Sequence, residues 1–286
     1  MRIGIQLPTA TPEQFQADVA AAKGADSLWT NQLPGGWDAL LALGTVGGTQ
    51  ELGTSVIPTY PRHPAVLADQ ALTLQALSGG RFTLGIGPSH PQVITGQYGL
   101  PYTAPARHTR EYLEVLRPLL RGEHVKHSGE FFTVDTALTI QADPPPVLIA
   151  ALGPRMLEVA RDLADGTIAV WIRPDTVSDY LVPRLHEGAR VAAGVMVAVT
   201  NDPDGVREQF ARETEPIGTL SAYRAILDRG GISSPADTLI AGSEEVVLRE
   251  IQRFADAGLT DLVVAPLGDR PRVVDLVTST ARMLEP

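Results

Sequence analysis

The stretch from residue 78 to residue 90, SGGRFTLGIGPSH, combines a group that can transfer a proton with backbone that can approach a ligand closely. Phe82 to Ile86 is a short apolar run typical of a buried strand. Gly87 follows at its end, where the absence of a Cβ lets another molecule approach the backbone. His90 comes next to this turn, and its imidazole, with an ordinary pKa of about 6.5, suits acid–base chemistry at neutral pH. We therefore expect a ligand site with His90 as the candidate catalytic residue, although a solvated or packed histidine fits the same pattern.

The other polar candidates predict neither a metal site nor covalent catalysis. The chain has no cysteine, which excludes disulfides, thiolate ligands and cysteine nucleophiles. His124 and His127 point to opposite sides of a strand-like segment, so they are poorly placed to share a metal. Ser89 lacks the strand–turn–helix G-x-S-x-G setting of a serine nucleophile. Gly87 is followed by Pro88 rather than by a third glycine and a helix, which disfavours a nicotinamide-dinucleotide fold.

Two further groups of residues are candidates for ligand contact. Gly153 and Pro154 are expected to begin a helix, whose free N–H groups favour an anion, and Arg155 adds a positive charge there. A plain strand-to-helix turn explains the same residues. Trp37 and Trp171 fall near the ends of expected strands and can shape an apolar pocket, or simply fill the core.

The composition is that of a globular protein with a large core. The chain has 286 residues, 44% hydrophobic and 20% charged, which suits one α/β barrel of about 250 residues. A formal charge of −10 without a basic cluster argues against nucleic acid and anionic membranes as partners and leaves small molecules. No apolar run reaches the roughly 18 residues of a membrane span, and Met1 to Gly4 enters a strand rather than a signal peptide. We therefore expect a soluble, cytoplasmic protein.

Strands and helices alternate along the chain, which predicts parallel strands joined by right-handed crossovers. The eight strands expected are Arg2–Leu7, Ser27–Thr30, Leu52–Ile57, Arg81–Ile86, Pro146–Ala151, Gly166–Trp171, Val191–Val199 and Thr260–Pro266. The helices expected around them are Thr11–Lys23, Trp37–Gly48, Pro64–Leu77, Pro154–Leu163, Thr176–Ala189, Pro203–Glu213, Ser221–Asp228, Ser243–Ala257 and Pro271–Leu284.

The alternation is interrupted once, by an insertion over about residues 91–145. Pro105 to Arg121 is predicted as a helix, and His124–His127 and Phe131–Val134 as a hairpin that turns at Ser128 and Gly129. An insertion of this size at the carboxyl end of a strand usually forms a lid or wall of a site. Eight strands without an internal repeat favour a single domain over residues 1–286, a (β/α)8 TIM barrel with the insertion after the fourth strand. An open doubly wound sheet is the alternative.

Several short motifs, taken in order, resemble the bacterial luciferase-like monooxygenase superfamily, and most of all its branch that uses the deazaflavin coenzyme F420. The resemblance extends from residue 1 to about residue 270. It implies a (β/α)8 barrel, hydride transfer between coenzyme F420 and a small organic substrate, and often a homodimer. The motifs are GADSLW at 24–29, LGTSV at 52–56, RHP at 62–64, LSGGRF at 77–82, LGIG at 84–87, AALGP at 150–154 and AGLTDLV at 257–263.

The resemblance also implies positions for the cofactor. A non-prolyl cis peptide between Ser55 and Val56 would form a bulge behind the central ring, where an ordinary trans strand end is the alternative. The other cofactor-binding residues implied are Gly87, Pro88 and Ser89 against the rings, and Leu152, Gly153, Pro154 and Arg155 at the ribityl-phosphate arm.

The chain departs from the family pattern after the second strand. Many deazaflavin relatives have an acidic residue followed by a histidine there, whereas this sequence has Gln32 and Leu33, neither of which moves a proton at neutral pH. We place both in the substrate pocket and leave His90 as the remaining proton donor. Two alternatives stay open, an FMN-dependent monooxygenase and a non-catalytic deazaflavin carrier or sensor.

Overall fold

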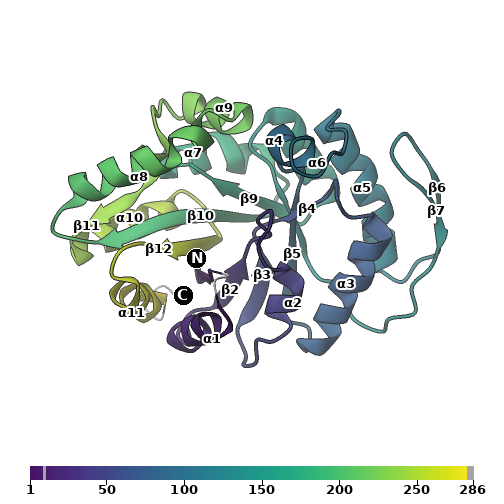
Figure 1. The fold of residues 1–286 in the computed structure, drawn as a ribbon, viewed down its shortest axis with the longest axis horizontal. Coiled ribbons are helices and arrows are strands. Elements are labelled where there is room, and N and C mark those ends of the chain that lie inside the picture. The colour runs from purple at the N-terminus through teal and green to yellow at the C-terminus, as the bar shows by residue number, and fades with distance from the viewer. Residues whose placement is uncertain (9–10, 282–286) are drawn as a thin grey trace.

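Eight parallel strands close into a ring in the structure, a computed structural model that describes residues 1–8 and 11–281 (Figure 1). The ring closes because Arg2 to Ile5 of the first strand pair with Asp261 to Val264 of the last. This confirms the (β/α)8 barrel, and the open-sheet alternative is wrong. In ring order the strands are β1 (Arg2–Gln6), β2 (Ser27–Thr30), β3 (Glu51–Thr54), β5 (Phe82–Gly87), β8 (Val147–Ala150), β9 (Gly166–Val170), β10 (Arg190–Val199) and β12 (Asp261–Pro266).

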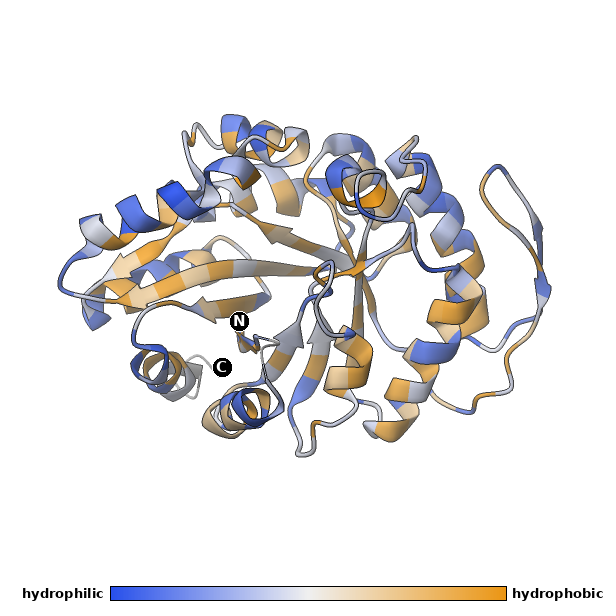
Figure 2. Ribbon diagram, viewed as in Figure 1, coloured by the Kyte–Doolittle hydropathy of each residue, from blue (hydrophilic) through white to orange (hydrophobic). Residues whose placement is uncertain are grey.

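Helices surround the ring, and Figure 2 shows hydrophobic residues along the strands and alternating with hydrophilic ones along the helices. Such alternation gives each helix an apolar side that packs on the barrel. The main helices between strands are α1 (Pro12–Ala21), α2 (Ala39–Leu43), α3 (Pro64–Leu77), α6 (Pro154–Leu163), α8 (Pro203–Gly218), α9 (Ser221–Arg229), α10 (Glu244–Asp256) and α11 (Arg270–Ala281). Among the described residues, none of the helices has both the length and the apolar character needed to cross a membrane.

Two expected helices are shorter than predicted. The helix expected over Trp37–Gly48 is only α2, because the Asp38 carboxylate accepts hydrogen bonds from the N–H groups of Leu40 and Leu41 and so caps its start. The helix expected over Thr176–Ala189 is broken into α7 (Pro174–Thr176), a π turn (Val177–Leu181) and a 3-10 turn (Val182–Arg184). Pro183 lies in the last turn, and proline cannot donate the backbone hydrogen bond that continues a helix.

The third expected strand is split, and one strand was not expected. A cis peptide between Ser55 and Val56 separates β3 from β4 (Ile57–Pro58), which pairs only with β5. The implied cis bond is thus confirmed. The unexpected strand, β11 (Ile240–Gly242), pairs with Val197 to Val199 at the far end of β10. Three residues are too few to show a hydrophobic period in the sequence.

The insertion has the predicted helix and hairpin. It contains α4 (Pro91–Ile94), α5 (Pro105–Leu120) and the antiparallel strands β6 (Val125–Ser128) and β7 (Thr133–Thr136), which lie at the right of Figure 1. Glu111 of α5 anchors the hairpin turn, because its carboxylate accepts hydrogen bonds from the N–H groups of residues 130, 131 and 132 at 2.8–3.0 Å. A side chain at Gly129 would collide with this carboxylate at 2.1 Å.

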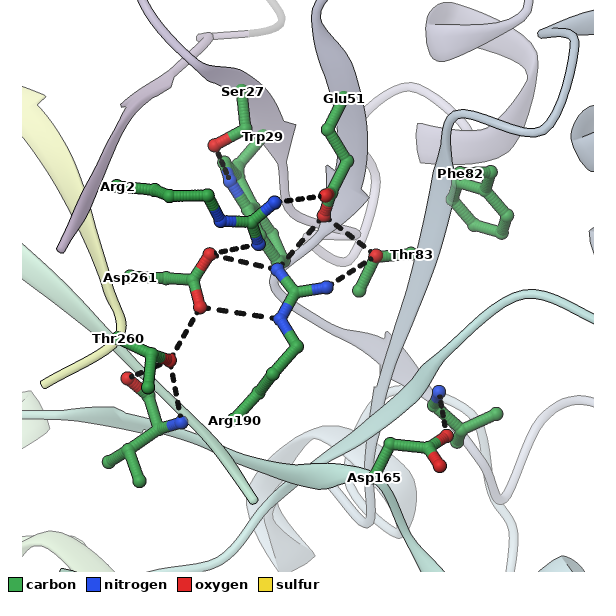
Figure 3. A network of polar contacts seen from close by, with 12 residues as sticks. Arg2, Ser27, Trp29, Glu51, Phe82, Thr83, Asp165, Arg190, Thr260 and Asp261 are labelled. Atoms are coloured by element: carbon green, nitrogen blue, oxygen red, sulfur yellow. Dashed lines mark hydrogen bonds and ion pairs between the residues drawn. The ribbon is translucent and has the colours of Figure 1, made fainter. Parts of the chain in front are cut away.

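A network of charges closes the amino-terminal end of the barrel (Figure 3). Arg190 of β10 pairs with Asp261 of β12 at 2.8 Å and with Glu51 of β3 at 2.9 Å, and it donates to the Thr83 hydroxyl at 2.9 Å. Arg2 of β1 pairs with the same two carboxylates. Burial alone would raise the pKa of Asp261, but the hydrogen bond from Arg190 and the two arginine charges outweigh it and hold that pKa below its ordinary value. The network therefore joins four strands of the ring by charge.

Next to this network, toward the carboxyl ends of the strands, Trp29 fills the middle of the barrel. Its side chain is fully buried, and its Nε1–H donates to the Ser27 hydroxyl at 2.8 Å. A Cβ at Gly53 would lie 2.3 Å from the indole, so only glycine leaves room there. The surrounding layer consists of Leu148, Ile168, Ala192 and Val263, and Val56 and Ala150 pack against it. Packed side chains thus fill the barrel interior from its amino-terminal end as far as Val56 and Ala150.

Candidate active site at the carboxyl ends of the strands

A pocket of about 350 Å³ opens at the carboxyl ends of β2, β3, β5 and β8, within the usual range of about 300–1,000 Å³ for small-molecule sites. Residues of α4, of the start of α5 and of α9 complete its wall. The helices α4, α6 and α9 lie together along the upper edge of Figure 1. The pocket therefore lies where a parallel barrel places its active site.

The cis peptide contributes both of its residues to the pocket. Ser55 and Val56 line it, and the Ser55 hydroxyl donates to Gln6 Oε1 at 2.8 Å. The Gln6 amide nitrogen is buried without a partner among the described residues. Gly87 lies beside Val56, and a Cβ there would come within 3.0 Å of Val56 Cγ2 and 2.9 Å of Ala150 Cβ. A small residue at position 87 therefore keeps this apolar part of the pocket clear.

The turn after β5 is pinned to the insertion. Pro88 and Ser89 line the pocket, and Ser89 has a left-handed backbone with φ of 61°. The Ser89 carbonyl accepts a hydrogen bond from the Tyr102 hydroxyl at 3.1 Å. Burial raises the pKa of Tyr102 to about 12, so its hydroxyl stays protonated and keeps donating. Tyr102 is thus a pocket residue that the sequence analysis missed.

His90 lines the pocket, as predicted, and meets an aromatic residue from another part of the chain. His90 directly precedes α4, and its side chain makes no capping hydrogen bond to that helix. The His90 ring packs edge-to-face on Tyr223 of α9, with ring centroids 4.7 Å apart. Burial lowers the pKa of His90 from its ordinary value, so the imidazole is mostly neutral at pH 7. Tyr223 was also missed, since nothing in the sequence of its helix indicates that it reaches this site.

The start of α6 forms another side of the pocket. Leu152 and Gly153 line it, whereas Pro154 and Arg155 are exposed at the beginning of the helix and do not. The N–H groups of Met156 and Leu157 donate to the Gly153 carbonyl at 3.1 and 2.9 Å. Because Pro154 has no N–H, the Arg155 amide is left as the donor of this first turn. The Arg155 guanidinium makes no ion pair with a described residue.

Gln32 and Leu33 both line the pocket, at the positions where, by the resemblance, many deazaflavin relatives have an acidic residue and a histidine. Gln32 Oε1 accepts a hydrogen bond from the Ala39 N–H at 2.9 Å and so supports the start of α2. Leu33 is 55% exposed and adds apolar surface to the rim. Neither residue replaces the chemistry of an acid–histidine pair.

The two tryptophans predicted to shape the pocket do not line it. Trp37 packs against Phe15 of α1, with ring centroids 6.0 Å apart, and so covers the core beside that helix. Trp171 follows β9 with φ of 60° and is buried between Phe210 and Tyr223, each 6.0 Å away. Trp171 therefore lies behind the pocket wall, where it packs against Tyr223.

No charged side chain lines the pocket within residues 1–8 and 11–281. Its polar groups are neutral amides, hydroxyls and the His90 imidazole, and the rest is apolar. The described residues also contain no cluster of histidine, aspartate and glutamate that could hold a metal ion. The pocket is suited to a mainly apolar group with few hydrogen-bonding atoms.

Comparison with known proteins gives consistent results. Residues 8–275 match the profile of a family described as luciferase-like monooxygenase. A protein of Mycobacterium tuberculosis, named as a candidate coenzyme F420-dependent oxidoreductase, is 31% identical over 238 residues, covering 71% of this chain and 68% of its own. The 5,10-methylenetetrahydromethanopterin reductase of Archaeoglobus fulgidus is 29% identical over 282 residues, covering 83% of each chain.

The fold recurs in a solved structure as well. An F420-dependent secondary alcohol dehydrogenase, in complex with an F420–acetone adduct, superposes with a TM-score of 0.84 over 100% of this chain and 99% of its own, at 20% identity. At that identity the likeness concerns the fold.

Proposed function

This chain belongs to the luciferase-like monooxygenase family, and from that membership we propose that its pocket binds coenzyme F420 and that the enzyme transfers a hydride between this deazaflavin and a small organic substrate. The relatives named after coenzyme F420 support the cofactor. The observation that carries the proposal is the pocket floor, where Val56, Gly87 and Ala150 present a small, apolar surface to a planar group.

The residues around the pocket fit a deazaflavin. Val56 and Gly87 would lie against the rings, while the buried Gln6 amide, which lacks a described partner, offers a donor beneath Ser55. The Arg155 amide and guanidinium, both free of described partners, would hold the phosphate of the cofactor's arm. The role of these side chains is to orient one face of the ring toward the substrate and to exclude water.

The cofactor, once bound, supplies a hydride rather than oxygen chemistry, since it has carbon where a flavin has the reactive ring nitrogen. The protein then has to supply or accept one proton for each hydride moved to or from a carbonyl-like substrate. His90 is the residue that we assign to this proton, because it lines the pocket and its imidazole takes up a proton in mildly acidic solution.

Titration of the purified protein with coenzyme F420 and, separately, with FMN tests the cofactor. We expect F420 to bind at least about tenfold more tightly, a difference of about 1.4 kcal/mol, as measured by the change in cofactor fluorescence. A preference for FMN would instead identify an FMN-dependent monooxygenase.

Replacement of Gly87 by alanine tests the ring position. The new methyl group would press on Val56 and Ala150 and narrow the floor, so we expect the F420 dissociation constant to rise about tenfold. Gly47→Ala is the matched control, because Gly47 is exposed outside the pocket and a Cβ there meets no atom within 4 Å. Equal affinities in both variants and the wild type would place the ring elsewhere.

A carrier or sensor of deazaflavin is a second candidate, favoured by Gln32 and Leu33 at the place of the acid–histidine pair and by the use of Gln32 Oε1 in supporting α2. The two functions differ in turnover. Anaerobic mixing of the protein and reduced F420 with a panel of enones, imines and nitro compounds separates them, since only the enzyme oxidises the cofactor.

A further inference from the structure

Tyr223 brings a phenol to the pocket from α9, a helix outside the motifs that carry the family resemblance. Tyr223 is half-buried and lines the pocket beside Ala222. Burial raises the pKa of Tyr223 above its ordinary value, so the hydroxyl keeps its proton throughout the neutral range. The group is therefore a hydrogen-bond donor whenever the enzyme is folded at neutral pH.

The Tyr223 ring is held between two other rings. His90 packs edge-to-face on one part of it, at 4.7 Å and an interplanar angle of 65°, and Trp171 on another, at 6.0 Å and 79°. Phe210 of α8 in turn supports Trp171 at 6.0 Å. Contacts of this kind contribute roughly 0.5–1.5 kcal/mol each beyond area burial. They fix the plane of Tyr223 and leave little freedom to its hydroxyl.

The backbone on both sides of this ring adopts a costly conformation. Ser89, next to His90, has φ of 61°, and Trp171 has φ of 60°. The other described non-glycine residue with a positive φ is Ala104, at 45°, just before Pro105 of the pocket wall. Such residues cost about 1–3 kcal/mol each and concentrate at functional sites. The chain thus accepts strain at the positions that place His90 and Trp171 against Tyr223.

The Tyr223 hydroxyl has no protein partner among the described residues. The neighbouring tyrosines differ, because the hydroxyl of Tyr60 donates to the Thr103 carbonyl, that of Tyr102 to Ser89, and that of Tyr180 to Leu152. Each of these three hydroxyls is therefore already engaged in a hydrogen bond to a backbone carbonyl of the protein. A fixed donor at a pocket wall without a partner is available to a bound molecule.

The wall around Tyr223 indicates what kind of molecule that is. Leu33, Val93, Met156 and Ala222 line the pocket. None of its lining residues in the described chain is an aspartate, glutamate, lysine or arginine, and the His90 imidazole is mostly neutral at pH 7. A charged substrate would lose its hydration here without a compensating partner, which is unfavourable. A neutral molecule with one acceptor atom loses little and gains the hydrogen bond.

We propose that Tyr223 is a substrate-binding residue whose hydroxyl donates a hydrogen bond to the carbonyl oxygen of a neutral, mainly apolar substrate. The inference rests on the proposed function, which makes the pocket a site of hydride transfer. His90, on the edge of the same ring, then lies next to the carbonyl that has to be protonated. The substrate class is neutral ketones and enones, and anionic sugars and carboxylates are excluded.

The equilibrium binding of small neutral probes to the protein loaded with oxidised F420 tests this inference. No turnover occurs, because the oxidised cofactor cannot reduce a ketone. The probes are two pairs in which C=CH2 replaces C=O, namely acetophenone with α-methylstyrene and cyclohexanone with methylenecyclohexane. We expect each ketone to bind the wild type about tenfold more tightly than its hydrocarbon partner, and Tyr223→Phe to abolish this preference. Benzoate, of similar shape but charged, should not bind.

The control is Tyr98→Phe, which removes the hydroxyl of an exposed tyrosine outside the pocket and should leave the ketone preference unchanged. A ketone preference that survives in Tyr223→Phe overturns the inference, and so does wild-type protein that binds benzoate or neither member of a pair. Failure of the wild type to bind F420 is seen before any probe is added. Such a failure contradicts the proposed function. The role of Tyr223 is then tested by measuring the binding of the same ketone and hydrocarbon pairs to the cofactor-free protein.

Discussion

Replacement of Asp261 by alanine is expected to lower the free energy of unfolding by about 3–5 kcal/mol, the usual cost of removing one member of a buried ion pair. The Asp261 side chain is 2% exposed and accepts hydrogen bonds from Arg190 and Thr260, at 2.8 and 2.6 Å, and from Arg2. Without it, two arginines share the single carboxylate of Glu51. Urea denaturation should show a lower midpoint at an unchanged slope.

The matched control for Asp261 is Asp162→Ala. Asp162 also pairs with two arginines, Arg110 and Arg161, but its side chain is 35% exposed, so its loss should cost at most about 1 kcal/mol. Similar losses in both variants would show that burial of the network does not matter. The contrast therefore isolates the effect of desolvation.

The stabilisation by Asp261 should also depend on pH. Because the pKa of Asp261 is lowered in the folded protein, its contribution is fully present above the unfolded value of about 3.9 and is lost as the pH falls through the folded value. Asp261→Asn keeps the shape and removes the charge. This variant should therefore lose less stability than the wild type on acidification below about pH 4.

Replacement of His90 by alanine is expected to lower kcat/KM for the reduction of an enone by reduced F420 about 100-fold at pH 6, the lower end of the contribution of a general acid. Because burial lowers the pKa of His90, its protonated form predominates only at a pH below the ordinary value of about 6.5. Wild-type kcat/KM should therefore fall as the pH rises above that lowered pKa, whereas the variant should show a low, flat profile.

The control for His90 is His124→Ala. His124 lies exposed before the β6–β7 hairpin, where it pairs with Asp135, and its loss should leave the pH profile unchanged. F420 affinity, measured in parallel, separates a catalytic effect from a binding effect. If His90→Ala keeps both the turnover and the profile of the wild type, the proton comes from another group.

The barrel could be predicted from the sequence because each of the eight strands of the ring and most helices carry a local signal. Pro64–Leu77 and Pro154–Leu163, for example, are bounded by prolines at their starts and agree with the structure residue for residue. The failures are also local. Asp38 caps α2 and so fixes its start after Trp37, and Pro183 breaks a helix that hydrophobic periodicity alone would continue.

The site could be predicted only in the parts that belong to strand ends. Gly87 to His90 and Gly153 follow directly from the turn after a strand, and the Ser55–Val56 bulge came from family resemblance. Tyr223 reaches the pocket through the packing of α9, which no local pattern reveals. Trp171 was predicted to shape the pocket, because a left-handed backbone is not expected of a bulky residue. In the structure it has this backbone, and its ring is buried between Phe210 and Tyr223.

The Trp29 layer has a consequence for how such a chain can change over evolution. It separates the charge network, which holds the ring together, from Val56 and Ala150, on which the pocket rests. Groups that share no partner contribute almost independently to the free energy of folding. Substitutions at positions such as 33, 93 or 223 can therefore change the lining of the pocket, while the charge network and the Trp29 layer continue to stabilise the barrel.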